Sequence, residues 1–293
     1  MPASGTDIEI LERLLGRVDR TTFYAVYGIT KKCNWLDSRQ RAFIELLKMC
    51  DNGSERELVL KLLERYSYLS GDDLEAAVQT LAEVVINEWK CVPNQSIFAA
   101  IAGDTDPDGS QAIIQSLKNY LTEADGWNTK KFFSQLEDAL PKCKTNSNLV
   151  LIEDFVGTGN KVTKAIERVN EYFGANSISE VNLFILSVSA MEASRPVIDE
   201  LKIKYHCVHW LKKGISDYSA DDLVKEDLSG IKALSSKLSK KFKGQYMNPL
   251  GYKKSEALVY LQNISVPNNV FSIFWWPKLL NGTRRNTLFS RQR

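Results

Sequence analysis

The sequence predicts an α/β fold in which a parallel sheet is flanked by helices and is preceded by an all-helical N-terminal domain. Apolar residues recur at helical spacing before Pro93, whereas short apolar runs alternate with helical patterns after it. This alternation is typical of a parallel sheet covered on both faces. We therefore expect a helical domain at 1–92, an α/β domain at 93–215, and a C-terminal extension at 216–293 that packs on the α/β domain.

The composition is that of an ordinary globular protein. The 293 residues are 44% hydrophobic and 25% charged, with a net charge of +2, which excludes disordered, collagen-like and disulfide-scaffold classes. Apolar runs stay shorter than the roughly 18 residues of a membrane span. The N-terminus shows no basic-then-apolar signal pattern, so we expect a cytoplasmic protein that does not enter membranes. The five cysteines form no C-x-x-C pair and are expected to be reduced and buried.

Three helical stripes define the N-terminal part. The second helix is expected to begin with a capping box formed by Ser54 and Glu57, and the third is expected to begin at Ser70. The stripes are Leu11, Leu14, Leu15 and Val18; Val59, Leu62, Leu63 and Tyr66; and Leu74, Val78, Leu81 and Val85. No catalytic cluster stands out here, so this domain is a candidate surface for a protein partner.

Four apolar runs after Pro93 are the expected strands. They lie at 97–102, 149–155, 181–188 and 205–210. Helical patterns separate them, with starts expected near Ser110 and after the second run, and a third helix reaching about Lys204.

The most informative segment is 150–160, where a strand pattern ends in two acids and a glycine turn. Glu153 and Asp154 fall at the carboxyl end of the run, and a helical pattern begins after Gly159. Ligands of parallel sheets bind at the carboxyl ends of strands. Glycines and a helix N-terminus offer backbone N–H groups to an anion, and carboxylates can accept from ribose hydroxyls, directly or through Mg²⁺. The pattern therefore favours a sugar phosphate as ligand.

This strand, acidic pair, small-residue loop and helix resemble the signature of type I phosphoribosyltransferases, and the surrounding element order extends the resemblance over 93–215. The resemblance implies that Glu153 and Asp154 are the catalytic and metal-binding acids, which hold the ribose hydroxyls with Mg²⁺ as cofactor. It implies that the adjoining loop binds the 5′-phosphate of phosphoribosyl pyrophosphate (PRPP) or of a nucleotide. The loop residues expected to bind are Val156, Gly157, Thr158, Gly159, Asn160 and Lys161.

Three departures from the family pattern limit what the resemblance implies. Gly157 stands where many purine-salvage members carry an acid as catalytic base. The segment at the pyrophosphate-loop position, 103–110, contains no basic residue and should repel pyrophosphate unless a metal intervenes. Its acids are Asp104, Asp106 and Asp108. A mobile catalytic loop is not evident, although 122–128, with Trp127, lies where one is expected.

The acidic segment also resembles the opening of an EF-hand calcium loop, Asp104-x-Asp106-x-Asp108-Gly109. Its twelfth position is Gln115 where a bidentate Glu belongs, and Pro107 further spoils the fit. A solvated turn, or a loop that lends a carboxylate to Mg²⁺, is the preferred interpretation.

Several segments of the C-terminal part are similar to the extension of a bacterial branch of phosphoribosyltransferase-like proteins from prokaryotic conflict and defence systems. They are Asn248–Gly251, Val266–Asn269, Phe274–Pro277 and Leu288–Arg291. This resemblance implies a role in antiviral defence.

The C-terminal part also contains a segment, 228–255, with seven lysines and no acid. Such a run is either a solvated helix face or a patch at Lys232–Lys254 that faces phosphates or nucleic acid. The arginines further on could extend that patch or contribute to contacts in a homo-oligomer; they are Arg284, Arg285, Arg291 and Arg293.

The aromatic run 271–276 could stack bases, although core packing is the commoner use. His206 and His209, with Cys207, are a weak metal candidate, because positions three apart on a strand face opposite sides.

Two functional hypotheses follow. In the first, the protein is an enzyme that binds PRPP or a nucleotide with Mg²⁺ and transfers or hydrolyses at the anomeric carbon. In the second, it is a catalytically inactive nucleotide sensor or effector-complex subunit that engages a protein or nucleic-acid partner. The absent loop acid and the acidic 103–110 segment favour the sensor, while the acidic pair and phosphate loop are compatible with both.

Overall fold

The computed structural model describes residues 20–102, 108–218 and 220–291, which divide into two compact units. Unit 1 takes the described residues within Met1–Tyr68, Lys213–Tyr260 and Val266–Gln292. Unit 2 takes those within Leu69–Lys212 and Leu261–Ser265. The expected division at 92 and 215 remains a prediction.

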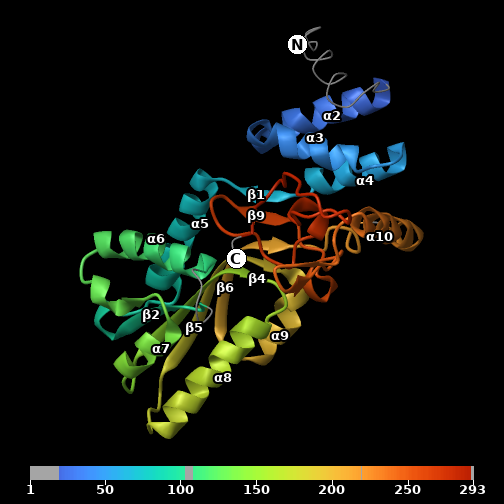
Figure 1. Cartoon of the computed structure of the whole chain (residues 1–293). Helices are drawn as coiled ribbons and strands as arrows, with labels where there is room; N and C mark the ends of the chain where they lie inside the picture. The colour runs from blue at the N-terminus through green and yellow to red at the C-terminus, as the bar shows by residue number, and fades with distance from the viewer. Residues whose placement is uncertain (1–19, 103–107, 219, 292–293) are drawn as a thin grey trace. The chain divides into compact units, whose positions relative to one another are not determined.

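A five-stranded parallel sheet forms the centre of unit 2 (Figure 1). Its strand order is β3-β2-β4-β5-β6, and every neighbouring pair is parallel. The strands are β2 (Ser96–Ala100), β3 (Phe132–Phe133), β4 (Asn148–Val156), β5 (Asn182–Met191) and β6 (Lys204–Leu211). The four strands expected from apolar runs are therefore present. Strand β3, at the edge, was not predicted.

Helices cover both faces of this sheet, as the α/β pattern predicts. Side chains alternate between faces along a strand, and Leu149 and Leu151 of β4 share one core with α8 (Asn160–Ala175). Helices α5 (Gly71–Glu83) and α6 (Gly109–Glu123) contact the sheet strands β2, β4, β5 and β6. Helix α8 buries one apolar stripe against the sheet, which is Val162, Ala165, Ile166, Val169 and Phe173.

The helix before β6 is shorter than predicted. Residues Glu192–Ser194 form a 3-10 turn, and α9 runs only from Arg195 to Glu200. Lys202 then takes a left-handed conformation with φ of 53°, which a continuing helix does not allow. Between α6 and β4 the chain also forms 3-10 turns at Thr129–Lys131 and Leu140–Lys142 and the short helix α7 (Leu136–Ala139).

The N-terminal helices are present, but they do not stand as a clearly separate all-helical domain. They are α2 (Arg20–Lys32), a 3-10 helix (Asn34–Arg39), α3 (Gln40–Lys48) and α4 (Gly53–Glu64). Strand β1 (Ser67–Leu69) follows and pairs with β9 (Val259–Leu261), and Ser67 N donates to Leu258 O. The predicted stripe at Leu11–Val18 lies outside the described residues.

The predicted start of α4 was wrong by two residues. Asn52, rather than Ser54, is the N-cap, and its Oδ1 accepts from Glu55 N at 2.9 Å. The extended backbone of Asn52 lets its side chain turn back onto the first turn, whereas Ser54 is already inside the helix. The predicted start of α5 at Ser70 is confirmed, because Ser70 and Asp73 form a reciprocal capping box. After α5 the chain forms a π-helical turn, Val84–Glu88, and then a 3-10 turn, Pro93–Gln95.

The C-terminal part of unit 1 contains little regular structure beyond one helix. Its elements are α10 (Asp221–Ser236), β7 (Lys241–Phe242), β8 (Gln245–Tyr246) and 3-10 turns at Tyr252–Lys254 and Ser272–Phe274. The aromatic run 271–276 is buried, so it packs the core and presents no surface for stacking bases. All five cysteines are free and buried, as predicted. No helix in the described ranges is both long enough and apolar enough to span a bilayer.

Candidate functional site

The two acids of the predicted motif lie at the carboxyl end of β4, the middle strand of the sheet. All nine residues of this strand are buried. Glu153 is 3% exposed and Asp154 is 7% exposed. Glu153 contacts Lys161 of α8, and the Asp154 carboxylate lies next to Gly109 at the start of α6, so the two adjacent side chains point toward different helices. The strand thus places two carboxylates at the carboxyl end of the sheet, one on each face.

Lys161, in the first turn of α8, neutralises part of this acidic cluster. Its Nζ lies 2.9 Å from Glu153 Oε1 and 2.9 Å from Asp108 Oδ2. The second oxygen of Glu153, Oε2, is buried and has no hydrogen-bond partner. A buried carboxylate oxygen without a donor is costly. The site therefore has unused capacity to bind a cation or a hydrogen-bond donor.

Asp108 joins the cluster from the start of α6. It is the N-cap of that helix, and its Oδ1 accepts from Ser110 N at 3.2 Å, which leaves Oδ2 for Lys161. The neighbouring Gly109 is required here, because a Cβ atom on it would collide with the Asp154 carboxylate. The sequence pattern had indicated that this acidic segment could lend a carboxylate to a metal, and Asp108 is in place to do so. Asp104 and Asp106 lie outside the described residues.

The calcium-loop alternative does not fit the described residues. Its sixth position, Gly109, begins α6, and its twelfth position, Gln115, lies well inside that helix and bonds to Asn119. An EF-hand loop needs these positions in a loop that surrounds the ion.

The turn between β4 and α8 leaves the N-terminus of α8 open. Gly159 is the N-cap, with φ of 80°, and no side chain caps the helix. A Cβ atom at Gly159 would lie 2.8 Å from Val197 Cγ1, so both backbone angle and space require glycine. The first turn contains no acid. Free N–H groups and the helix dipole at such an end favour an anion, as the sequence motif predicts for a phosphate.

The other predicted loop residues occupy different environments. Thr158 and Lys161 are half-buried beside the turn, and Asn160 is exposed. Val156 is buried in the core shared with α8, so only its backbone is available to a ligand.

Burial controls the protonation of the cluster. Burial raises the pKa of the Glu153 carboxyl well above its usual range, although the Lys161 ammonium opposes this shift. Burial also raises the pKa of Asp154, and the charge of Asp108 adds to the effect. For Lys161, burial acts to lower the pKa, but the charges of the carboxylates outweigh it and the pKa is raised. A hydrogen bond from the Glu153 carboxyl opposes the rise in the pKa of Asp154.

The donor set also fits a hard divalent cation. One carboxylate oxygen each from Asp108, Glu153 and Asp154 lie within 4.8 Å of one another. Oxygen ligands of this kind suit Mg²⁺, and the oxygen without a partner on Glu153 is available to it. Lys161 offsets only one of the three carboxylate charges when all three acids are ionised. His206 and His209 belong to no such group among the described residues, and burial lowers the pKa of His209.

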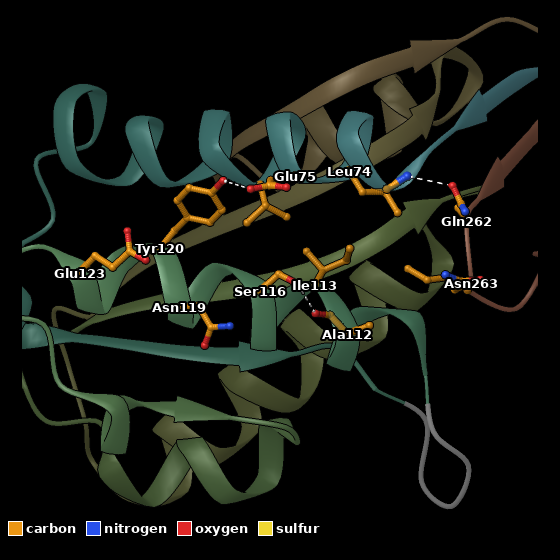
Figure 2. Close-up of a pocket in the computed structure, with 13 residues that line it drawn as sticks. Leu74, Glu75, Ala112, Ile113, Ser116, Asn119, Tyr120, Glu123, Gln262 and Asn263 are labelled. Atoms are coloured by element: carbon orange, nitrogen blue, oxygen red, sulfur yellow. Dashed lines mark hydrogen bonds between the residues drawn. The ribbon is translucent and has the colours of Figure 1, made fainter.

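A groove of about 650 Å³ that the sequence did not reveal lies in unit 2 between α5 and α6, with residues 262–264 at one end (Figure 2). Inside it the Tyr120 hydroxyl bonds to Glu75 Oε1 at 3.1 Å. Ile264 contributes to its wall and also lies next to Gly109, near the Asp154 carboxylate. Its residues come from distant segments and form no contiguous motif, so no sequence signal pointed to it. The segment 122–128, which lies where a catalytic loop is expected, contains the last two residues of α6 and the loop that follows it, in which Trp127 packs edge-on against Phe98 at 5.6 Å.

A parallel sheet whose middle strand ends in two acids, followed by a glycine turn that opens a helix, defines a type I phosphoribosyltransferase-like protein. The chain belongs to the PRTase-CE family, whose profile matches residues 47–291. No curated protein matches the sequence.

Solved structures with a similar fold include three that share little sequence with this chain. A hypoxanthine-guanine phosphoribosyltransferase from Schistosoma mansoni in complex with IMP is 12% identical, with a TM-score of 0.33, over 48% of this chain and 65% of that chain. The chain thus spans less than two thirds of that enzyme. A hypothetical protein from Neisseria gonorrhoeae with bound ppGpp is 16% identical, with a TM-score of 0.34, over 57% and 97%. An orotate phosphoribosyltransferase from Aeropyrum pernix is 14% identical, with a TM-score of 0.31, over 54% and 76%.

Proposed function

We propose that this protein binds the ribose 5-phosphate part of PRPP or of a nucleotide where β4 meets α8. Glu153 and Asp154 accept hydrogen bonds from the ribose hydroxyls, and the Gly157–Asn160 turn binds the phosphate through backbone N–H groups. The observation that carries the proposal is the combination of two buried acids with an uncapped helix N-terminus that carries no acid in its first turn. Hydroxyl donors and a phosphate are the groups that these two features suit.

The first candidate activity is transfer or hydrolysis at the anomeric carbon. Such reactions develop positive charge on the ribose, and carboxylates positioned beside the ring stabilise that charge. When bound, Mg²⁺ would supply a positive charge that polarises and neutralises the phosphate oxygens. Asp108, Glu153 and Asp154 are the residues that would hold it.

The second candidate is a nucleotide sensor that does not turn its ligand over. Gly157 leaves the turn without an acid that could act as a base, and Lys161 already forms ion pairs with two of the acids. In this version the N-terminal helices engage a protein partner. Both versions include a role in prokaryotic antiviral defence in the cytoplasm, which is supported by the sequence resemblance of the C-terminal segments.

Isothermal titration calorimetry tests the binding proposal. PRPP, and then ribonucleotides, are titrated into the wild type and into a Glu153→Ala/Asp154→Ala variant, with and without Mg²⁺. The matched control is Glu226→Ala/Asp227→Ala, which removes an adjacent acidic pair from α10 with no ion pair in the described structure. We expect binding to the wild type and to the control, and loss of binding in the first variant. Failure of both ligand classes to bind the wild type would overturn the proposal.

The same samples distinguish the two candidates. Release of pyrophosphate or of a free base during incubation, followed by chromatography, indicates an enzyme. Binding with intact ligand recovered after hours indicates the sensor.

A further inference from the structure

The last part of the chain is strongly basic, and its only acid is buried. Residues 228–293 contain twelve Lys and Arg and one acid, Glu256. Glu256 is buried and accepts from Ile215 N, Ser216 N and Ser216 Oγ. The exposed surface of the described residues in this segment therefore bears positive charge without any acid from the same segment.

A short hairpin concentrates this charge. Strands β7 and β8 are antiparallel, with Lys241 opposite Tyr246, and the turn between them is Lys243-Gly244. Both turn residues have positive φ, 45° and 80°, which is the geometry of a type I′ turn. Asn or Gly is normally favoured at the position that Lys243 occupies. The geometry of the turn alone therefore does not explain why this residue is a lysine.

A second basic segment, 278–284, lies against this hairpin. Ser239 N donates to Lys278 O at 2.9 Å, and Lys278 pairs with Arg284 in an antiparallel bridge. The Arg284 guanidinium lies over the Phe242 ring at 5.7 Å. Phe242 in turn meets Trp276 edge-on at 6.4 Å, and Trp276 is fully buried. The core of unit 1 thus anchors both segments side by side.

We call this region the hairpin surface and define it by Lys240, Lys241, Lys243, Tyr246, Lys278 and Arg284. In the described structure none of its basic side chains forms an ion pair. Lys237 shows the contrast, because its Nζ lies 2.7 Å from Asp51 Oδ2 and also bonds to Met49 O. Lys237 therefore has a structural role, whereas the hairpin surface retains uncompensated charge.

Tyr246 gives this surface a flat apolar face as well as charge. It is 71% exposed, and the Lys241 ammonium lies 5.2 Å from its ring centroid. A surface with exposed aromatic rings between basic side chains suits a single nucleic-acid strand. The rings stack on its bases, and the cations contact its phosphates. In a duplex the bases are already stacked on each other and cannot reach such a ring.

We propose that the hairpin surface binds single-stranded nucleic acid, with little sequence preference. Lys240, Lys241 and Lys243 contact consecutive phosphates, and Tyr246 stacks on a base. This binding is independent of the sugar-phosphate site on unit 2. DNA and RNA present the same phosphates and bases to this surface, so both are tested.

Fluorescence anisotropy with labelled 20-nucleotide DNA and RNA strands, and a duplex of the same sequence, tests the proposal at several salt concentrations. The variant Lys240→Glu/Lys241→Glu/Lys243→Glu should bind at least about tenfold more weakly than the wild type. Its salt slope should fall by about 2, because each phosphate contact on a single strand contributes about 0.7. Tyr246→Ala should weaken binding about fivefold or more with an unchanged salt slope.

The matched control is Lys130→Glu/Lys142→Glu/Lys164→Glu, which changes the net charge equally at exposed lysines of unit 2. It should bind within about twofold of the wild type. Acetylation footprinting of the wild type adds a readout that does not depend on any variant folding, because a bound strand should protect Lys240, Lys241 and Lys243.

Several results would overturn the proposal. They are equal loss in the control, a Tyr246→Ala variant that binds like the wild type, a duplex that binds as tightly as the single strands, or lysines that stay unprotected. Flotation with probe vesicles that contain 30% phosphatidylserine distinguishes binding to an anionic membrane from binding to nucleic acid. Binding to vesicles without binding to either strand would replace nucleic acid with an anionic membrane.

Discussion

Replacing Lys161 with methionine tests whether charge compensation holds the candidate site together. Lys161 Nζ lies 2.9 Å from Glu153 Oε1 and 2.9 Å from Asp108 Oδ2. At this distance of 2.9 Å and an effective dielectric constant of about 20, one such contact has a Coulomb energy of about 6 kcal/mol. Desolvation of the buried Glu153 offsets most of that energy. The Lys161 side chain is 41% exposed, so solvent screening reduces the remainder further.

We therefore expect Lys161→Met to lower the free energy of unfolding by about 2 kcal/mol at pH 7.5 without divalent cations. The deficit should shrink at pH 5. Burial raises the pKa of both Glu153 and Asp154, so these carboxyls take up protons as the pH falls and their repulsion disappears. Urea unfolding at both pH values measures the effect. Lys164→Met is the matched control, because Lys164 is exposed on the same helix and has no ion pair in the described structure.

Mg²⁺ should restore the stability that Lys161→Met loses. A divalent cation can replace the lost ammonium beside the three carboxylates, and binding to the folded state alone stabilises it by mass action. Without a lysine to compete, the variant should bind Mg²⁺ at least about tenfold more tightly than the wild type. The reasoning is refuted if the deficit is equal at both pH values, if Mg²⁺ restores nothing, or if Lys164→Met loses as much stability.

Two further substitutions probe the same junction. Gly159→Ala should lower the free energy of unfolding by about 2 kcal/mol in urea titrations, because alanine is strained at φ of 80° and meets a neighbouring side chain. The control Gly174→Ala, in open space on the same helix, should be neutral or slightly stabilising. Equal effects at the two glycines would contradict the geometry of the turn. Folding raises the pKa of the Glu153 carboxyl above its value in the unfolded chain. The folded wild type therefore loses stability as the pH rises from the unfolded-state pKa toward the folded-state pKa. Glu153→Gln cannot ionise, and it should gain stability on the order of 1 kcal/mol relative to the wild type between pH 5 and pH 8; a pH-independent difference in thermal unfolding would count against burial as the cause.

The β4–α8 junction could be predicted from sequence because each of its signals is local. An apolar run indicates a strand buried on both faces, and acids at its carboxyl end must lie where parallel strands end and ligands bind. Gly159 marks the turn, because only glycine fits its left-handed backbone. The strand expected at 149–155 is observed as β4 with one more residue at each end.

Features that depend on distant segments could not be predicted in this way. Strand β3 has two residues and exists only because Phe132 and Phe133 pair with β2, so it has no periodicity of its own. The partner of Lys161 at Asp108 is 53 residues away in sequence. The lysine stretch predicts positive charge, but only the structure separates Lys237, which pairs with Asp51, from the lysines of the hairpin surface.

The charge of the cluster bears directly on which ligand the proposed site can accept. When ionised, the three carboxylates with Lys161 leave a net charge of two negative units around a site that is proposed to bind a phosphate. A dianionic phosphate would be repelled unless a divalent cation enters with it or protons neutralise the buried acids. Ligand affinity should therefore depend steeply on Mg²⁺ for PRPP, whose pyrophosphate adds negative charge, and less steeply for a nucleoside monophosphate. A protein that binds monophosphates well without Mg²⁺ uses Lys161 as its cation, which favours the sensor over the enzyme.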